Sequence, residues 1–282
     1  MLNKLIGSLI DLALKEDIGD GDHTSLACIP EKAHGKAQLL VKQKGIIAGV
    51  DIAELIFHKL SAKTDFKKFI DDGSKVSPGD ISFIVSGRIR ILLQAERLVL
   101  NIMQRMSGIA TQTHQYVTEL EGLNTKVLDT RKTTPGMRLL DKMAVKLGGG
   151  ENHRMGLFDL IMIKDNHIDF AGGIENAIHR TQEYLLKNNI KLKIEVEARS
   201  MGDIQTILST GGIDCILLDN FSIEDTRAAV ELIDGKVKTE SSGGITLKNL
   251  RAYAECGVDY ISVGALTHQI KSLDLSMKAI DF

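Results

Sequence analysis

The first part of the chain mixes helical and strand-like patterns. Residues 1–16 place apolar side chains at close to helical spacing and predict a helix. Short apolar runs broken by glycine over residues 36–49 predict strands, and residues 51–60 predict a helix. Residues 71–90 predict further strands joined by a turn at residues 77–80, because proline presets the φ angle of the first corner position.

A strongly amphipathic helix is predicted next. Residues 89–106 carry a wide apolar face, which is typical of a helix packed on a core. Ser107 and Gly108 interrupt this pattern, and a second helical stretch runs to about residue 120. We therefore expect a boundary between two domains here, with a first domain over residues 1–108 and a second over 109–268.

After Gly122, strand-like and helix-like runs alternate. The strand-like runs cover residues 125–129, 160–164, 192–197, 215–219, 236–240 and 260–263, with helix-like runs at about 136–147, 174–188, 202–209, 223–233 and 247–256. Such alternation predicts βαβ units and a parallel sheet, so the fold class is α/β. Six or seven units favour a closed or nearly closed barrel over an open doubly wound sheet.

Nearly every predicted strand of the second domain ends in a polar or glycine-rich segment. In β/α barrels the chemistry lies at the C-terminal ends of the strands, so we expect these segments to share one rim. They contain Asp129, Lys164, Glu195, Glu197, Asp219, Glu240, Ser242-Gly243-Gly244 and Gly264-Ala265.

Positive charge is concentrated in one stretch of a chain whose net charge is −2. Between residues 131 and 164 there are seven lysines and arginines and three acids. This local excess indicates an anionic ligand rather than a generally basic protein. Arginine at positions 131 and 154 supplies the forked, permanently charged donors that bind carboxylates in pairs of hydrogen bonds.

Two further features of the rim suggest a phosphorylated substrate. The glycine turns at residues 242–244 and 264–265 resemble the phosphate site that many such barrels carry after their last strands. Glu197 and Asp219 suit a Mg²⁺ ion carried by that substrate, because Mg²⁺ prefers a few protein oxygens together with water and phosphate. The alternative is that both acids form ion pairs with lysines of the rim.

The bulk composition narrows the class of protein. The chain has 43% hydrophobic and 26% charged residues, and its net charge of −2 argues against nucleic acid as the main partner. It lacks an apolar run of the roughly 18 residues expected of a membrane span. Three scattered cysteines, at positions 28, 215 and 256, fit a reducing compartment. We therefore expect a cytoplasmic location.

Seven motifs resemble the quinolinate phosphoribosyltransferase family, also called carboxylating nicotinate-nucleotide pyrophosphorylase. In chain order they read D-T-R-K-T-T-P-G-M-R, G-G-G-E-N-H-R-M-G-L, I-M-I-K-D-N-H, E-V-E-A, L-L-D-N, S-S-G-G-I and S-V-G-A-L-T-H. The resemblance implies an N-terminal α/β sandwich domain followed by an incomplete, open β/α barrel of about six or seven units. It also implies that a C-terminal helix over residues 269–282 returns to the first domain.

The resemblance implies an activity as well. Such an enzyme transfers the phosphoribosyl group of phosphoribosyl pyrophosphate to quinolinate, with Mg²⁺ as cofactor. The products are nicotinate mononucleotide, pyrophosphate and CO2, in the de novo biosynthesis of NAD.

The resemblance assigns roles to individual residues. The two carboxylates of quinolinate would contact Arg131, His153, Arg154 and Lys164. The catalytic set would be Lys132, Lys164, Glu197 and Asp219, with the two lysines near the phosphates and the two acids at the ribose hydroxyls and Mg²⁺. The 5′-phosphate end would be lined by Ser242, Gly243, Gly264 and His268. Arg97 would enter the site of a neighbouring subunit, which makes a homodimer the smallest functional assembly.

Two alternatives remain open at this stage. Lys164, at a strand end among carboxylates, is placed like the lysine of a Schiff-base aldolase. The chain could also be a non-catalytic or differently specific relative of the same fold, of the type associated with molybdate operons.

Overall fold

The fold was analysed in a computed structural model, which describes residues 2–280. Contacts within the chain divide it into two units. The first unit contains the residues up to His114, the segment Thr133–Gly149 and the residues from Leu266 onward. The second unit contains Gln115–Lys132 and Gly150–Ala265.

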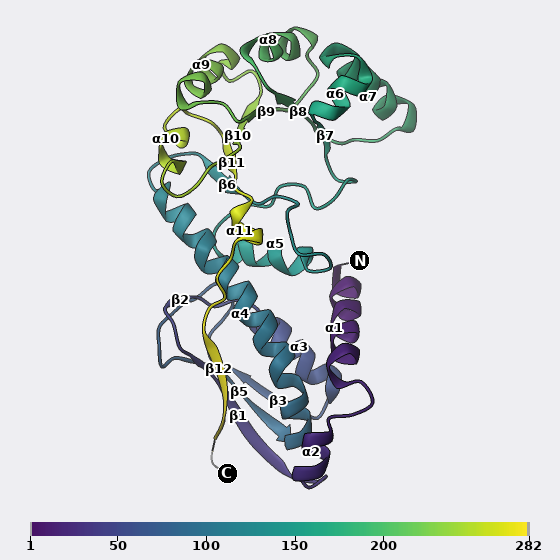
Figure 1. The fold of residues 1–282 in the computed structure, drawn as a ribbon, viewed down its shortest axis with the longest axis vertical. Helices are drawn as coiled ribbons and strands as arrows, with labels where there is room; N and C mark the ends of the chain where they lie inside the picture. The colour runs from purple at the N-terminus through teal and green to yellow at the C-terminus, as the bar shows by residue number, and fades with distance from the viewer. Residues whose placement is uncertain (1, 281–282) are drawn as a thin grey trace. The chain divides into compact units, whose positions relative to one another are not determined.

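The first unit is built on a four-stranded antiparallel sheet (Figure 1). In spatial order its strands are β12 (Leu275–Ile280), β1 (His34–Val41), β5 (Ile81–Arg88) and β3 (Asp65–Lys68). A two-stranded ribbon is formed by β2 (Gly45–Ile46) and β4 (Lys75–Val76). Helix α3 (Val50–Leu60) packs on the sheet through Phe57, whose ring centroid lies 6.2 Å from that of Phe83. The strands and the helix predicted over residues 36–90 are thus confirmed.

The C-terminal segment is a strand, and the prediction of a helix over residues 269–282 is wrong. Strand β12 pairs with β1 in a register that runs from Leu275 opposite Val41 to Ile280 opposite Lys36. Leu275 and Met277 are buried, and the residue between them is less so, which is the alternation of a half-buried strand. Residues 281 and 282 lie outside the described residues.

Helix α4 (Ile89–Glu119) is continuous through Ser107 and Gly108, so the predicted break at these residues is wrong. The boundary placed at residue 108 lies inside this helix. The Ser107 hydroxyl accepts a hydrogen bond from the Ala48 N–H at 2.9 Å and donates one to the Ala48 carbonyl at 3.2 Å. A Cβ atom on Gly108 would overlap the Lys271 carbonyl oxygen. Close packing against Ala48 and Lys271 therefore explains why a serine and a glycine occur inside the helix.

Four other helices belong wholly or largely to the first unit. They are α1 (Leu2–Ile18), α2 (His23–Cys28), α5 (Arg138–Leu147) and the short α11 (Ala265–His268). The first of them confirms the helix predicted over residues 1–16. Arg105 of α4 binds Asp141 of α5 through two hydrogen bonds of 2.8 Å each, and the Asp141 side chain is fully buried. This ion pair joins α5 to α4.

The second unit holds a six-stranded parallel sheet. In spatial order its strands are β6 (Lys126–Leu128), β11 (Tyr260–Ser262), β10 (Lys238–Ser242), β9 (Cys215–Asp219), β8 (Ile194–Ala198) and β7 (Ile161–Ile163). This order follows the sequence around a circle, and within the described chain only β6 and β7 are sequential strands that do not pair. A doubly wound sheet would instead reverse its order at a switch point. The unit is therefore an open β/α barrel, as the sequence predicted.

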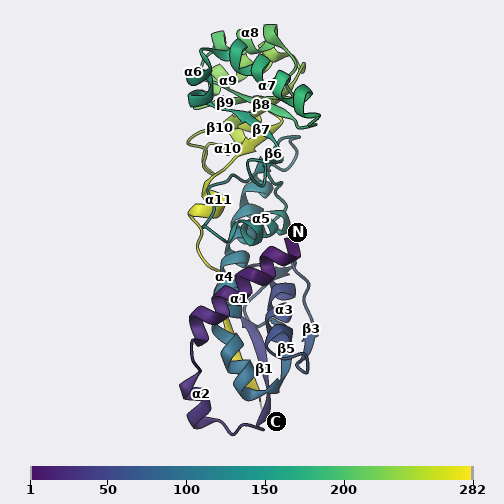
Figure 2. The ribbon, with the colours of Figure 1, turned by 90° about the vertical axis from the view of Figure 1, so that its right-hand side faces the viewer.

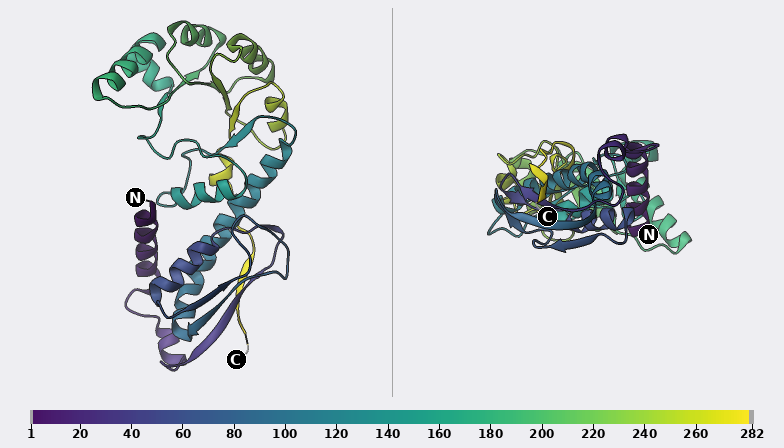
Figure 3. Two further views of the ribbon diagram at one scale, coloured as in Figure 1. Left: turned by 180° about the vertical axis from the view of Figure 1, so that it is seen from behind. Right: turned by 90° about the horizontal axis from the view of Figure 1, so that it is seen from below.

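Helices cover the outer side of the second unit's sheet (Figures 1, 2 and 3). They are α6 (Asp165–Ala171), α7 (Ile174–Asn188), α8 (Met201–Thr210), α9 (Ile223–Ile233) and α10 (Leu250–Ala254). Four of them match predicted helices, whereas the seven-residue α6 was not predicted. Because all six strands are parallel, their C-terminal ends lie at one edge of the sheet. Among the described residues, none of the helices is long and apolar enough to cross a membrane.

Candidate active site

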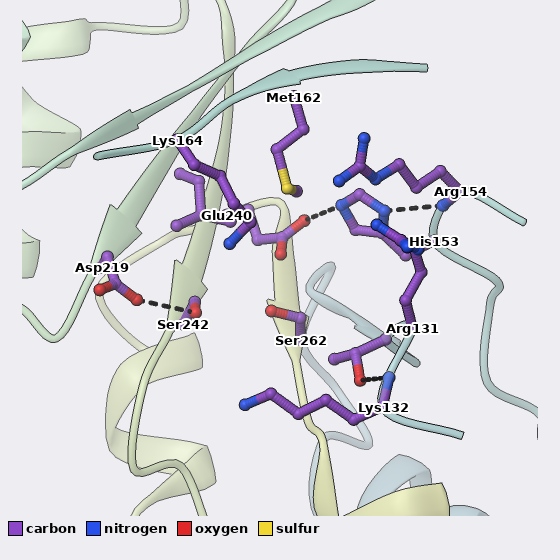
Figure 4. Close-up of a pocket in the computed structure, with 12 residues that line it drawn as sticks. Arg131, Lys132, His153, Arg154, Met162, Lys164, Asp219, Glu240, Ser242 and Ser262 are labelled. Carbon is purple, nitrogen blue, oxygen red and sulfur yellow. Dashed lines mark hydrogen bonds and ion pairs between the residues drawn. The ribbon is translucent and has the colours of Figure 1, made fainter. Parts of the chain in front are cut away.

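A pocket lies at the C-terminal edge of the second unit's sheet (Figure 4). All of its lining residues belong to the second unit. They are Thr130, Arg131, Lys132, His153, Arg154, Met162, Lys164, Leu217, Asp219, Glu240, Ser242 and Ser262. Seven of these, namely Arg131, Lys132, His153, Arg154, Lys164, Asp219 and Ser242, were proposed from the sequence.

The strand pleat explains which lining residues the sequence did not single out. Side chains two positions apart on a strand point to the same face, so each residue at a strand end has a neighbour one layer deeper in the barrel. Met162 lies in this way below Lys164, and Leu217 lies below Asp219. The same step of two residues relates Glu195 to Glu197 and Glu240 to Ser242. The sequence placed both deeper glutamates at strand ends but assigned them no role.

Lys164 and Glu197 form an ion pair at the ends of two adjacent strands. The Lys164 Nζ atom lies 3.3 Å from the Glu197 Oε2 atom. The Glu197 side chain is 6% exposed, whereas that of Lys164 is 46% exposed. The pairing of the two residues agrees with the alternative in which an acid of the rim neutralises a lysine, and it leaves the ammonium accessible.

Asp219 is tied to the strand that follows it in the barrel. The Ser242 hydroxyl donates to the Asp219 Oδ1 atom at 3.1 Å, and the Asn220 amide donates to Oδ2 at 2.7 Å. Gly243, directly after Ser242, has a φ angle of +95°, and a Cβ atom there would overlap the Asn220 side chain. Glycine at this position is therefore required both by the backbone conformation and by the space available.

Two arginines lie close to each other without a mutual partner. The Arg131 Nε atom is buried and has no hydrogen-bond partner among the described residues. Burial lowers the pKa of Arg154, and the positive charge of Arg131 lowers it further. One Nη1 hydrogen bond of Arg154 goes to the Leu160 carbonyl at 3.3 Å. Glu195 and Asp159 offset part of this repulsion, and an anion bound beside the two arginines would offset more of it and could pair with the unsatisfied donor.

His153 contacts two buried glutamates and the backbone N–H of Arg154. Its Nε2 atom lies 3.0 Å from Glu195 Oε2 and 3.4 Å from Glu240 Oε2. Its Nδ1 atom accepts the backbone N–H of Arg154 at 2.7 Å. Both ring nitrogens of His153 therefore have protein partners, and its proposed contact with a carboxylate of quinolinate stays a prediction.

Of the other residues proposed from the sequence, one lines the pocket and three are not among its lining residues. Lys132 lines the pocket, and its backbone N–H bonds the Thr130 hydroxyl at 3.0 Å. Gly264 follows strand β11 in the second unit but is not among the lining residues. Arg97, on α4, and His268, at the end of α11, belong to the first unit.

The donor set at the rim is compatible with Mg²⁺. Glu197 and Asp219 offer carboxylate oxygens, the hard ligands that Mg²⁺ takes together with water and substrate phosphate. Each already has a polar partner, Lys164 for Glu197 and Ser242 for Asp219. These residues therefore fit an ion that arrives with its substrate and keeps most of its other ligands.

Profiles of two known domains match almost the whole chain. The quinolinate phosphoribosyl transferase N-terminal domain matches residues 22–107, and the C-terminal domain of the same enzyme matches residues 109–278. The chain belongs to the quinolinate phosphoribosyltransferase family. This membership agrees with the open barrel and with the basic pocket at its C-terminal edge.

Individual relatives of the family are similar over most of their length. Quinolinate phosphoribosyltransferase [decarboxylating] 1b of Nicotiana tabacum is 43% identical over 285 residues, which cover 96% of this chain and 81% of the relative. The probable nicotinate-nucleotide pyrophosphorylase [carboxylating] of Bacillus subtilis is 42% identical, covering 93% of this chain and 89% of the relative.

Solved structures of the family have the same fold. NadC from Streptococcus pyogenes superposes with a TM-score of 0.92 at 37% identity, covering 98% of this chain and 97% of that one. The nicotinate-nucleotide pyrophosphorylase from Francisella tularensis superposes with a TM-score of 0.92 at 39% identity, covering 99% and 97%. The similarity thus extends over both units of this quinolinate phosphoribosyltransferase family member.

Proposed function

We propose that the protein transfers the phosphoribosyl group of phosphoribosyl pyrophosphate to quinolinate and releases CO2, giving nicotinate mononucleotide and pyrophosphate. The observation that carries the proposal is the juxtaposition of Arg131 and Arg154 in one pocket, with a buried donor of Arg131 left unpaired. A planar dicarboxylate supplies the two anionic groups that such a pair requires. Family membership supports the same substrate.

The pocket divides its charges as the transfer reaction requires. Loss of pyrophosphate from the anomeric carbon leaves positive charge on the ribose and negative charge on the leaving group. Glu197 and Asp219 are the carboxylates at the strand ends that would face the ribose, whereas Lys132 and Lys164 would stabilise the diphosphate. Mg²⁺, held by oxygens of Glu197 and Asp219, would supply further positive charge at the diphosphate.

The decarboxylation step needs no protein nucleophile. Once ribosylated, the pyridine nitrogen is cationic, so the electron pair left by departing CO2 is stabilised on the adjacent ring carbon, which then takes up a proton to give nicotinate mononucleotide. The protein then has to hold the ring and exclude water, and Met162 and Leu217 provide apolar lining for this purpose. The Lys164 amine is engaged in an ion pair with Glu197, which disfavours a Schiff base at this residue.

A homodimer and a cytoplasmic location complete the proposal. Arg97 would enter the pocket of a second copy of the chain, and Gly243, Gly264 and His268 would complete the 5′-phosphate end. The cytoplasmic location is supported by the three cysteines at positions 28, 215 and 256, all of which are free.

The proposal is tested by following CO2 from quinolinate labelled in its carboxyl groups. Release is expected only with phosphoribosyl pyrophosphate and Mg²⁺ present, and in a one-to-one ratio with pyrophosphate. Nicotinate, which has a single carboxylate, serves as the matched substrate control and should not react. Absence of labelled CO2 from a folded sample, or borohydride trapping of a carbonyl compound on Lys164, would overturn the assignment.

A further inference from the structure

A buried triad of His153, Glu195 and Glu240 lies at the pocket, one layer deeper than the strand ends. Its side chains are 8%, 3% and 2% exposed, and both glutamates reach the same ring nitrogen of His153. The Oε1 atoms of Glu195 and Glu240 have no hydrogen-bond partner among the described residues. Burying two acids with unsatisfied oxygens is costly, so packing alone does not account for this arrangement.

The backbone N–H of Arg154 determines which ring nitrogen of His153 carries the proton. This N–H donates to Nδ1 at 2.7 Å, and a nitrogen that accepts a hydrogen bond cannot itself carry hydrogen. The proton of the neutral ring therefore lies on Nε2, where it donates to Glu195 at 3.0 Å. The same argument excludes the triad as a metal site, although its ligand atoms lie within 4.8 Å of one another, because Nε2 has no lone pair to offer.

A second proton on the ring is opposed by the same contact. Without the Arg154 contact, the balance between burial, which lowers the pKa of His153, and the two carboxylates, which raise it, would place this pKa at about 10. The Arg154 N–H points at the lone pair where the second proton would have to bind. Because two donors cannot face each other at 2.7 Å, the geometry assigns the neutral ring with its proton on Nε2.

The segment that carries His153 and Arg154 depends on side-chain acceptors for its shape. Residues 152–160 form neither helix nor strand. The N–H of His153 bonds Asp129 Oδ1 at 2.9 Å, and the N–H groups of Met155 and Gly156 bond Asp159 at 2.7 and 2.9 Å. The Arg154 N–H completes this series through the His153 ring. A change of tautomer would therefore place two donors face to face in the middle of the segment.

We infer that Glu195 and Glu240 are positioning residues, which keep the proton of His153 on Nε2 and thereby hold Arg154 in the conformation that binds substrate. The inference rests on the proposed function for the identity of the substrate only. Arg154 is the residue through which the two glutamates act, since it lines the pocket and follows His153 directly. The negative charge of Glu195 also acts favourably on the Arg154 guanidinium.

The kinetic test compares two variants at one position. Glu195→Leu removes the acceptor for Nε2–H, whereas Glu195→Gln retains an amide oxygen that can accept it. We expect Glu195→Leu to raise the KM for quinolinate about 10- to 100-fold, the effect of losing a hydrogen bond to a charged group. The KM for phosphoribosyl pyrophosphate should stay close to the wild-type value, and Glu195→Gln should recover most of the loss. Glu231→Gln, an exposed position on α9, is the matched control.

A spectroscopic test measures the tautomer directly. In protein labelled with ¹⁵N-histidine, long-range ¹H–¹⁵N correlations should show His153 with a proton on Nε2 alone at neutral pH, with His153→Gln identifying its signals. Because this measurement uses wild-type protein, it remains decisive if Glu195→Leu fails to fold. It also needs no turnover, so failure of the proposed function would not be confused with failure of this inference.

Several results would overturn the inference. A His153 ring with its single proton on Nδ1, or with two protons at neutral pH, would contradict the tautomer. An unchanged KM for quinolinate in folded Glu195→Leu, an equal rise in the KM of both substrates, or no recovery in Glu195→Gln would contradict the positioning role.

Discussion

The Nζ atom of Lys164 lies 3.3 Å from the Oε2 atom of Glu197, which joins the ends of two adjacent parallel strands of the barrel. Residue 164 follows β7 directly, and residue 197 lies in β8, so the barrel alone brings the two side chains together. In this pair the carboxylate of Glu197 is buried, whereas the ammonium of Lys164 is accessible to solvent. The ion pair therefore offers a negative charge for the ribose, which is expected to become positive, and a positive charge for the diphosphate, which is expected to become negative.

Replacing Glu197 by Gln should slow the chemical step. The substitution keeps the side-chain volume but removes the negative charge that would stabilise the ribose in the transition state. We expect kcat to fall about 100- to 1000-fold, a typical cost of losing one electrostatic contact in a transition state. Single-turnover kinetics would measure this, with Glu183→Gln on the exposed face of α7 as the control. A kcat within twofold of wild type would contradict the role of Glu197.

Replacing Arg131 by Ala should abolish tight binding of quinolinate without unfolding the protein. The substitution removes a pocket charge whose Nε atom has no hydrogen-bond partner within residues 2–280, so little of the folded structure depends on it. We expect the Kd for quinolinate to rise at least about 100-fold, and Arg131→Lys to recover only part of it, because lysine lacks the forked donor. Titration calorimetry and thermal unfolding of the same samples check both statements. Retained affinity in Arg131→Ala would show that the pocket is wrongly assigned.

Gly243 and Gly235 allow steric overlap to be separated from backbone strain. Both have positive φ angles, +95° and +67°, but a Cβ atom meets the Asn220 side chain only at Gly243. Gly235→Ala should cost about 1 kcal/mol of unfolding free energy, and Gly243→Ala about 1–3 kcal/mol more. Gly243→Ala alone should also raise the KM for phosphoribosyl pyrophosphate. Equal effects of the two substitutions in urea unfolding and in steady-state assays would show that the overlap with Asn220 adds nothing to the backbone strain.

Two glycines inside helices should respond to alanine with opposite signs. Nothing lies within 4 Å of a Cβ atom on Gly7 in α1, so Gly7→Ala should stabilise the protein by about 0.5–1 kcal/mol through its higher helix propensity. A Cβ atom on Gly108 in α4 would overlap the Lys271 carbonyl oxygen, and Gly108→Ala should destabilise the protein by about 1–3 kcal/mol. Urea unfolding midpoints of the two variants give the signs. A stabilising Gly108→Ala would show that the contact with Lys271 is not tight.

Mixing two inactive variants tests the proposed sharing of Arg97 between subunits. Arg97→Ala and Lys164→Ala chains should each be inactive alone. After subunit exchange, about a quarter of the wild-type activity should return in an equal mixture, since half of the chains enter mixed dimers and each mixed dimer has one intact site. Exchange is verified with differently tagged chains. No recovery after verified exchange would exclude a shared site.

Much of this architecture was predictable from local sequence patterns. Six strand-like runs alternating with helix-like runs predicted the parallel sheet, because the periods of two and 3.6 residues are local properties. The rim residues Lys164 and Asp219 were predictable too, since the polar end of each strand marks the active edge of a barrel. The full length of helix α4 and the strand β12 were not predictable from the sequence. The sequence around Ser107 and Gly108 predicted a break in the helix. The actual reason for the glycine is its contact with the backbone of Lys271, which is distant in sequence.

The sequence by itself determined the fold class, the family and the basic character of the pocket, because these depend on periodicity, on motifs and on local charge. Only the tertiary structure decided that the His153 ring contacts Glu195 and Glu240. The three residues lie on separate segments, and their contact depends on the register between parallel strands. It depends equally on a backbone N–H that fixes the histidine ring, and neither feature can be read from a linear pattern.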